Sequence, residues 1–529
     1  MSNHYKNTRN ESTTLGSKLS RGKRKALQKI GKESQSKIEA ALHRQRSKNS
    51  TKLVRRAVDS PLPPKTELPP IAEFESWDFP TGMRSREPAP RPNFDFDCTE
   101  LEKMLELNEN NTTKDDAEKL YINLGIDFGT SSTKVVARFP YESGQPTFAI
   151  PAPIPCRVPG NPHLWRTILW LKDDGSIFMW PIANATVLDT LKQDLVVGSV
   201  NSNRFRTSLV EQVNHEQIAT AYLAYVISYV RGWLTTNQAQ AFRTREPVWR
   251  INVGMPTDSF DKPKVAESYR RVVSAALLLA DVGLPIAADS TELVLSEPEI
   301  IHAGTFIDIA EERGVAVVPE AAAEMTSFAK SERRADGLYM MIDVGAMTLD
   351  VTTFTLHSNP QLGKDPIYSF MTANIQPLGV ESYYWYQREG TSKDAFVEQC
   401  RHTLRWLINS TRRFRDPHSD RWKAGERLPI YLVGGGANHR LHRSIVDDLD
   451  PWMKQSLPND GTRLVPSDEL PKSMDTAGFD LDYGRMGVAW GLSFNFAEIG
   501  EIHSVSQTKD EKIQKNENWK GKYPGSEVM

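Results

Sequence analysis

Cysteine is scarce in this sequence of 529 residues, which has three: Cys98, Cys156 and Cys400. Because they are few, odd in number and far apart, they exclude a disulfide framework or a cysteine-based metal cluster and favour a reducing compartment. The sequence also lacks an apolar run long enough to span a bilayer, and its N-terminus lacks the apolar segment of a signal peptide. These absences predict a cytoplasmic protein without a transmembrane segment.

Residues 1–60 are almost free of aromatic side chains and contain 16 Lys and Arg against 4 Asp and Glu. This segment carries a formal charge of +12, whereas the whole chain carries −2. The composition predicts a disordered basic N-terminal extension. The alternative is an arm that binds an anionic partner, which would be nucleic acid, an acidic protein or a membrane surface.

The length predicts two to four domains, and a hydrophobic content of 39% is ordinary for a folded protein. Residues 61–118 are predicted to be a proline-rich linker that ends in a short acidic helix over Thr99–Glu109. The compact part is expected to begin near Lys119. Residues 501–529 are polar and are predicted to be a flexible tail.

A turn rich in small and hydroxyl side chains interrupts the apolar residues 121–139, YINLGIDFGTSSTKVVARF. The pattern predicts a strand, a tight turn and a second strand. Gly129 permits backbone N–H groups to approach an anion, and Asp127 can hold magnesium through its waters. Further donors are the following hydroxyls and amine: Thr130, Ser131 and Lys134. The stretch predicts a phosphate-binding hairpin, although an ordinary hairpin has the same pattern.

Residues 338–356, LYMMIDVGAMTLDVTTFTL, repeat this arrangement. Asp343 and Gly345 precede Thr348 and Asp350 between two apolar runs. The repetition predicts two similar half-folds that face one cleft.

A third glycine-rich turn follows a predicted strand in residues 429–437, PIYLVGGGA, and leads into a helix. It offers a surface without side chains beside a helix N-terminus. Further elements are predicted by periodicity and turn residues: a hairpin at 163–181, strands at 248–255 and 314–318, and helices at 215–234, 261–283 (capped by Asp258 or Asp261), 319–331, 393–413 and 484–496.

Five motifs occur in one order: GIDFGTSSTK, VPEAAAE, IDVGAMTLD, LVGGGAN and GVAWGLSF. In this order they resemble the actin and heat-shock-chaperone ATPase superfamily, and most closely the nucleotide-binding half of the seventy-kilodalton chaperones, over roughly residues 120–497. The resemblance implies an α/β, two-lobed actin-like ATPase fold with duplicated ribonuclease-H-like subdomains around a nucleotide cleft. Lobe I would span 119–336 and lobe II 337–500, with a reduced outer subdomain at about 386–428.

The resemblance also implies the roles of the site residues, with ATP and Mg as ligands. Asp127 and Asp350 would orient magnesium and its waters. Asp343, Glu320 and Lys134 would be the catalytic residues. The phosphates and the adenosine would be bound by the following residues: Gly129, Thr130, Ser131, Lys134, Gly345, Thr348, Gly434, Gly435 and Gly436.

Two residues depart from the chaperone pattern and favour slow hydrolysis or binding without turnover. Met347 adds bulk beside the expected γ-phosphate, and Glu320 follows Pro319 where the chaperones have a glutamate before the proline. Few residues follow the last motif, so the chaperones' peptide-binding domain is not expected.

The leading hypothesis is an ATP-binding, slowly ATP-hydrolysing chaperone-like switch that changes conformation for a protein partner. The alternatives are a polymerising actin-like filament protein, a small-molecule kinase of the sugar type and a nucleotide-bound scaffold without catalysis. The kinase would need a further aspartate base near the acceptor hydroxyl.

Overall fold

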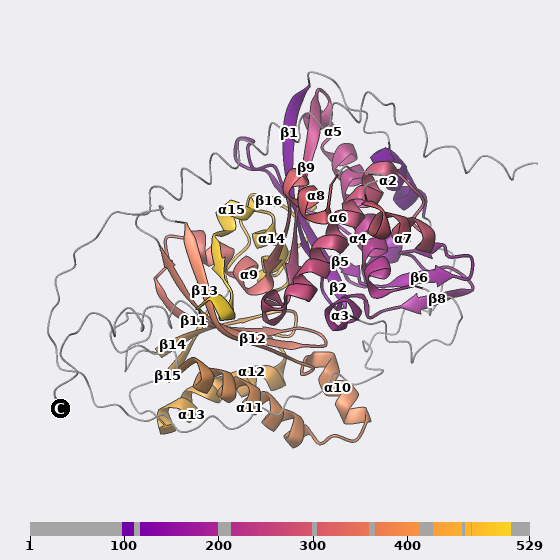
Figure 1. Cartoon of the computed structure of the whole chain (residues 1–529). Coiled ribbons are helices and arrows are strands. Elements are labelled where there is room, and N and C mark those ends of the chain that lie inside the picture. The colour runs from indigo at the N-terminus through magenta and orange to yellow at the C-terminus, as the bar shows by residue number, and fades with distance from the viewer. Residues whose placement is uncertain are drawn as a thin grey trace, which may run out of the picture.

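A computed structural model of the chain describes residues 98–109, 117–198, 213–298, 304–358, 365–412, 427–456, 461–466 and 468–508. The predicted basic extension and most of the proline-rich linker lie outside these residues. The fold is mixed α/β, with two large sheets and helices that cover them (Figure 1). No helix within the described ranges is long and apolar enough to cross a bilayer.

The first sheet is built around the predicted hairpin, whose strands β1 and β2 pair in antiparallel fashion. Strand β9 lies parallel to β1, and β10 lies parallel to β9, while β3 is antiparallel to β2. The short edge strand β16 is parallel to β3. The bounds are β1 Glu118–Asp127, β2 Ser132–Arg138, β3 Thr147–Ala149, β9 Arg245–Met255, β10 Val315–Pro319 and β16 Met474–Asp475.

The six strands of the second sheet repeat the order and the directions of these six strands of the first sheet. Its hairpin β11–β12 is flanked by β14 and β15, both parallel to β11, and by the antiparallel β13, to which β17 is parallel. The two halves predicted from the repeated hairpin are therefore alike in topology. The bounds are β11 Gly337–Val344, β12 Leu349–Ser358, β13 Pro366–Gln376, β14 Arg427–Val433, β15 Gly461–Val465 and β17 Glu501–His503.

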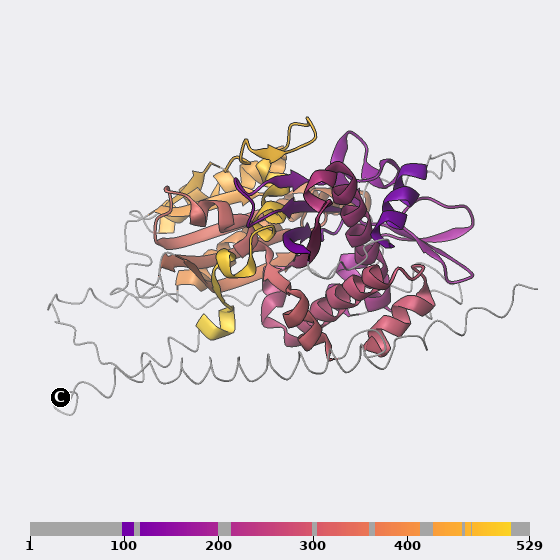
Figure 2. The same ribbon diagram turned by 90° about the horizontal axis from the view of Figure 1, so that it is seen from above.

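Helices separate into groups around the two sheets. In the turned view, the elements of the first sheet lie on one side of the molecule and those of the second sheet on the other (Figure 2). The first group contains α2 Thr99–Glu109, α3 Leu191–Val197, α4 His215–Asn237, α5 Ala239–Phe242, α6 Pro263–Val282, α7 Ala288–Ser296 and α8 Phe306–Arg313. The second contains α10 Val380–Arg388, α11 Lys393–Arg412, α12 Arg440–Asp447 and α13 Leu449–Ser456.

Several shorter elements complete the fold. Strands β6, β7 and β8 form a small sheet, in which β6 and β7 are the predicted Asp-Asp-Gly hairpin. The strand before it, β5, pairs with β2 and β4 instead, so the predicted hairpin at 163–181 is correct in its second part only. The bounds of these strands are β4 Arg157–Val158, β5 Asn161–Arg166, β6 Leu169–Lys172, β7 Ile177–Phe178 and β8 Ala185–Leu188. The remaining short elements are the 3-10 helices η2 Ile154–Cys156 and η4 Thr257–Asp261, and the helix α15 Phe496–Ile499.

Two helices, α9 (Glu320–Lys330) and α14 (Tyr483–Leu492), pack on each other between the sheets. One hydrophobic cluster joins both helices to strands of the second sheet. On the other side, α14 lies so close to β1 that a Cβ atom on Gly125 would be 2.3 Å from the carbonyl oxygen of Ala489. Where the helices cross, a Cβ atom on Gly491 would be 1.8 Å from the carbonyl oxygen of Ala323. Glycine at these positions allows the close packing.

We expect Gly491→Ala to lower the free energy of unfolding by about 2 kcal/mol, because the methyl group forces α9 and α14 apart. This effect should exceed the intrinsic preference of alanine over glycine in a helix. Gly337→Ala is a matched control, since a Cβ atom there would have no neighbour within 4 Å. Denaturant unfolding followed by circular dichroism measures both variants, and equal stabilities for the two would contradict this packing.

The structure corrects the predicted start of the compact part. The sequence places helix α2 in the linker, but Leu101 and Met104 are buried in the core of the first sheet. Glycine at position 232 of α4 permits this contact, because a Cβ atom there would be 2.0 Å from the carbonyl oxygen of Met104. The compact part therefore begins before Lys119.

The predicted flexible tail at 501–529 is wrong at its start. Residues 501–503 form β17 in the second sheet. Immediately afterwards, the backbone N–H and hydroxyl of Ser506 donate to the carboxylate of Asp261, at 2.8 and 2.7 Å. Residues 501–508 thus connect the second sheet to η4, which follows β9 of the first. The remainder of the tail lies outside the described residues, as does 413–426 of the predicted outer subdomain.

The predicted caps of the helix at 261–283 are also wrong. Helix α6 begins at Pro263, with Lys262 as its N-cap and without a side-chain cap hydrogen bond. Proline has no N–H to satisfy and a fixed φ suited to the first helical position, so the helix begins there. The predicted helix at 319–331 likewise begins one residue later, with Pro319 as its N-cap.

Candidate functional site

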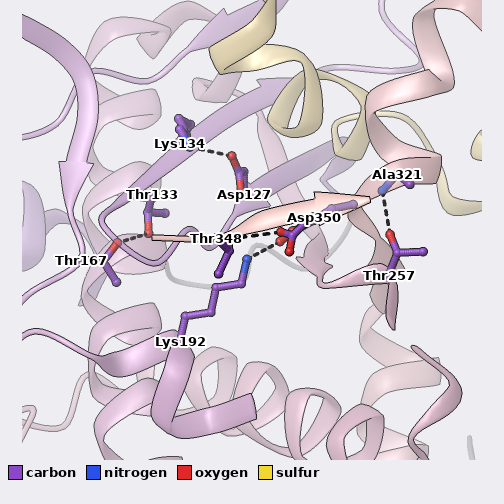
Figure 3. Close-up of polar contacts among 10 residues, drawn as sticks. Asp127, Thr133, Lys134, Thr167, Lys192, Thr257, Ala321, Thr348 and Asp350 are labelled. Carbon is purple, nitrogen blue, oxygen red and sulfur yellow. Dashed lines mark hydrogen bonds and ion pairs between the residues drawn. The ribbon is translucent and has the colours of Figure 1, made fainter. Parts of the chain in front are cut away.

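The first turn places a cation beside the carboxylate at the end of β1. Asp127 and Lys134 are register partners in the β1–β2 hairpin, and Lys134 Nζ lies 2.9 Å from Asp127 Oδ2 (Figure 3). The N–H of Gly129 donates to the carbonyl of Asp127 at 3.0 Å. A Cβ atom on Gly129 would be 2.2 Å from the carbonyl oxygen of Ser132, so the tight turn requires glycine.

The second turn has the same length and register as the first, with an acid where the first has a lysine. Asp343 and Asp350 are register partners in the β11–β12 hairpin. The Gly345 N–H donates to the carbonyl of Thr348 at 2.9 Å, and the Thr348 hydroxyl lies 3.3 Å from Asp350 Oδ2 (Figure 3).

The triple-glycine turn after β14 lies against the second hairpin. Gly434 has φ +88°, and a Cβ atom there would be 2.0 Å from Asp343 Oδ1. Its N–H donates to the carbonyl of Gly484 at 3.0 Å, while the Gly436 N–H donates to the carbonyl of Val344 at 2.8 Å. Both the backbone conformation and the lack of space explain glycine at position 434.

These turns face one cavity of about 380 Å³. Its walls come from both hairpins, the triple-glycine turn and the first turns of α9 and α14. Every site residue predicted from the sequence lines it: Asp127, Gly129, Thr130, Ser131, Lys134, Glu320, Asp343, Gly345, Thr348, Asp350, Gly434, Gly435 and Gly436. The structure therefore brings both acid-glycine-threonine turns to one cleft.

Lys192 is a cleft residue that sequence reasoning missed. It lies on α3 and extends toward the cavity (Figure 3), where its Nζ is 2.6 Å from Glu320 Oε1. Both residues are buried. Burial alone would lower the pKa of Lys192, but Glu320, with Tyr269 and Asp127, raises it above its ordinary value. The sequence offers one weak indication of this position. Lys192 lies between two leucines, Leu191 and Leu195, which the structure shows to be buried.

Glu324 was also missed. It follows Glu320 by one helical turn on α9, so the sequence PEAAAE directs both carboxylates to one face. Its side chain is buried, and Oε2 would be 2.4 Å from a Cβ atom on Gly487 of α14. Its Oε1 has no hydrogen-bond partner within the described residues. Burial, followed by the charges of Asp343 and Asp127, raises its pKa well above the ordinary value.

Carboxylates outnumber cations around the centre of the cavity. Burial, and then the charges of Glu320 and Asp127, raise the pKa of Asp343 to about 7. Burial and the charge of Asp343 raise the pKa of Asp350 well above its ordinary value. The electrostatic potential there favours a bound cation.

The donor set fits hydrated magnesium. No three His, Cys, Asp or Glu side chains of the described ranges are grouped to ligate a metal directly. Magnesium, however, usually keeps several waters and takes one or two carboxylates together with substrate phosphates. Asp350 Oδ1 is buried and has no hydrogen-bond partner in the described chain, so one carboxylate oxygen is available to such an ion or its waters.

The side chain of Met347 lies mostly away from the position expected for the phosphates. Its side chain is 5% exposed and belongs to the hydrophobic cluster of the second sheet, with Leu349 and Leu378. Its carbonyl accepts hydrogen bonds from the Gly379 N–H and the Ser382 hydroxyl. Met347 therefore anchors the turn to the core, although part of it borders the cavity.

No protein-family model matches the chain, and no curated protein matches it at a significant level. The function is therefore inferred from the site.

Proposed function

We propose that the protein is an ATP-binding, slowly ATP-hydrolysing switch with a two-lobed actin-like fold, whose cleft holds magnesium-ATP. One observation carries the proposal: two sheets that share a six-stranded order direct equivalent acid-glycine-threonine turns at a single cavity. The cavity volume lies within the usual range for small-molecule sites.

The two turns would bind the triphosphate from opposite sides. The hydroxyls of Thr130, Ser131 and Thr348 would donate to the phosphates, and Lys134 adds positive charge. The N–H groups of Gly129 and Gly345 donate within their own turns and hold the backbone in place. The triple-glycine turn would border the adenosine. Asp127 and Asp350 would hold magnesium through its waters, and the ion would neutralise charge on the phosphates.

Asp343 is the residue best suited to accept a proton from the attacking water. Burial raises its pKa to about 7 in the protein without magnesium, near physiological pH, where a general base is most effective. Water would add to the γ-phosphorus, the bond to ADP would break and the proton would pass to Asp343. Glu320, fixed by Lys192 at 2.6 Å, would orient the water, and Lys134 would stabilise the phosphate charge.

The packing of α9 and α14 supports a role as a conformational switch. These helices join the sheets through glycine and alanine contacts, which allow small sliding movements. Both helices also contribute residues to the cavity wall, Glu320 and Glu324 from α9 and Arg485 from α14. Nucleotide in the cleft would bias their relative position, and a protein partner would bind one arrangement.

We expect the wild-type protein to bind ATP in a magnesium-dependent manner, and Asp127→Asn to weaken this binding about tenfold or more, because the ion loses an outer-sphere ligand. Asp173→Asn is the control, since Asp173 is exposed on the β6–β7 turn away from the cavity. Isothermal titration with ATP, with magnesium and with EDTA, measures both. Wild-type protein that binds no ATP under either condition would refute the proposal. Sedimentation with ATP in the same samples would detect a filament.

A further inference from the structure

Arg485 occupies a fixed position beside the triple-glycine turn. It is the third residue of α14 and lines the cavity. The carbonyl of Gly484 accepts a hydrogen bond from the Gly434 N–H at 3.0 Å, and the Asp482 side chain accepts one from the Gly484 N–H at 3.1 Å. These two bonds hold the start of α14 against the turn.

The guanidinium of Arg485 lies with its face toward Gly435. A Cβ atom built on Gly435 would be 3.7 Å from Cζ, 3.9 Å from Nη1 and 4.0 Å from Nη2. Three nearly equal distances mean that the plane of the guanidinium, and not its edge, covers the glycine. The other face remains accessible, because Arg485 and Gly435 are both exposed residues at the cavity wall.

Arg485 also differs from the cavity lysines in its pairing. Lys134 and Lys192 form ion pairs with Asp127 and Glu320. The backbone N–H of Arg485 donates to the carbonyl of Asp482, but its guanidinium forms no hydrogen bond or ion pair with any part of the chain that the structure describes. An unpaired planar cation with one open face is suited to stack on a planar π system.

We propose that Arg485 is the base-stacking residue of this site, so that the nucleobase lies on the open face of its guanidinium beside the triple-glycine turn. This inference rests on the proposed function and identifies the wall that recognises the base. The phosphates are assigned to the two hairpin turns, which have their own donors and Lys134. Arg485 should therefore contribute to the affinity of the base and not to that of the triphosphate.

Competition experiments separate the two contributions. A fluorescent ATP analogue is first bound, with magnesium, to wild type, Arg485→Lys and Arg485→Ala. ATP, ADP or inorganic tripolyphosphate is then added to displace it. Lysine keeps the charge but removes the plane. We expect both variants to bind ATP and ADP about tenfold more weakly, and tripolyphosphate as wild type does. Arg440→Lys is the control, because Arg440 is exposed on α12 outside the cavity.

Each other outcome overturns the inference in a recognisable way. If Arg485→Lys binds ATP as wild type does, the flat face has no role. If Arg485→Ala binds both ATP and tripolyphosphate more weakly than wild type does, Arg485 contacts phosphate. If the wild-type protein binds neither ATP nor tripolyphosphate, the proposed function is wrong, and this inference is wrong with it.

Discussion

Asp343→Asn should abolish most ATP hydrolysis while making the nucleotide-free protein more stable. The stabilisation is expected because Asp343 has its pKa raised to about 7 by burial and by the charges of Glu320 and Asp127. An acid with a raised pKa destabilises the folded state whenever it is ionised. We expect a gain of about 2–4 kcal/mol in the free energy of unfolding at pH 8, and a loss of about a hundredfold or more in single-turnover hydrolysis.

The pH dependence of this gain identifies its cause. The folded state binds more protons than the unfolded state between the ordinary aspartate pKa, about 4, and the raised value, so the penalty from Asp343 grows as the pH rises through this window. The advantage of Asp343→Asn should therefore be nearly full above pH 7 and fall by about two thirds at pH 5. Urea unfolding without nucleotide at pH 5 and pH 8 measures it. A constant difference, or a less stable variant, would contradict the electrostatic explanation.

Lys192→Met should destabilise the protein by about 3–5 kcal/mol, because it leaves the buried Glu320 carboxylate without its cation. Lys192 Nζ and Glu320 Oε1 are 2.6 Å apart, and each side chain is 9% exposed. Adding Glu320→Gln to this variant should recover most of the loss, because the remaining group is neutral. Hydrolysis should stay low in both variants, since neither holds the ion pair beside the cleft.

An exposed pair on α13 is the matched control for this prediction. Lys454 Nζ lies 2.6 Å from Asp450 Oδ2, but its side chain is 41% exposed. Lys454→Met should change the unfolding free energy by less than about 1 kcal/mol, because water screens the pair. Chemical denaturation of the four proteins compares them. If Lys192→Met and Lys454→Met lower the free energy of unfolding equally, or if adding Glu320→Gln recovers none of the lost stability, the buried pair does not stabilise the fold as described.

The sequence allowed the hairpins and their convergence to be predicted because their signals are local. Gly129 and Gly345 occur where a turn must be tight, and alternating apolar residues on each side specify the strands. Since the two turns follow the same pattern, their location at equivalent positions of two sheets could also be anticipated. The structure has both hairpins, with Asp127 and Asp343 at the same cavity.

The remaining features depend on contacts between distant segments. Lys192 becomes a cleft residue only because α3 packs near α9, and no local pattern specifies that contact. Arg485 lies against Gly435, which is distant from it in the sequence. Helix α2 has an acidic face and follows a proline-rich stretch, which predicts a linker, yet Leu101 and Met104 pack it against the core beside α4. Tertiary packing, and not propensity, decides each of these cases.

The central claim is that the two hairpin turns bind one metal-nucleotide between them. A crystal structure of the protein with a non-hydrolysable ATP analogue and Mn²⁺, located by its anomalous signal, tests it most directly. The account predicts triphosphate density between Thr130 and Thr348, with the metal at water-bridging distance from Asp127 and Asp350. Density that contacts one turn alone, or a nucleotide bound outside this cavity, would contradict it.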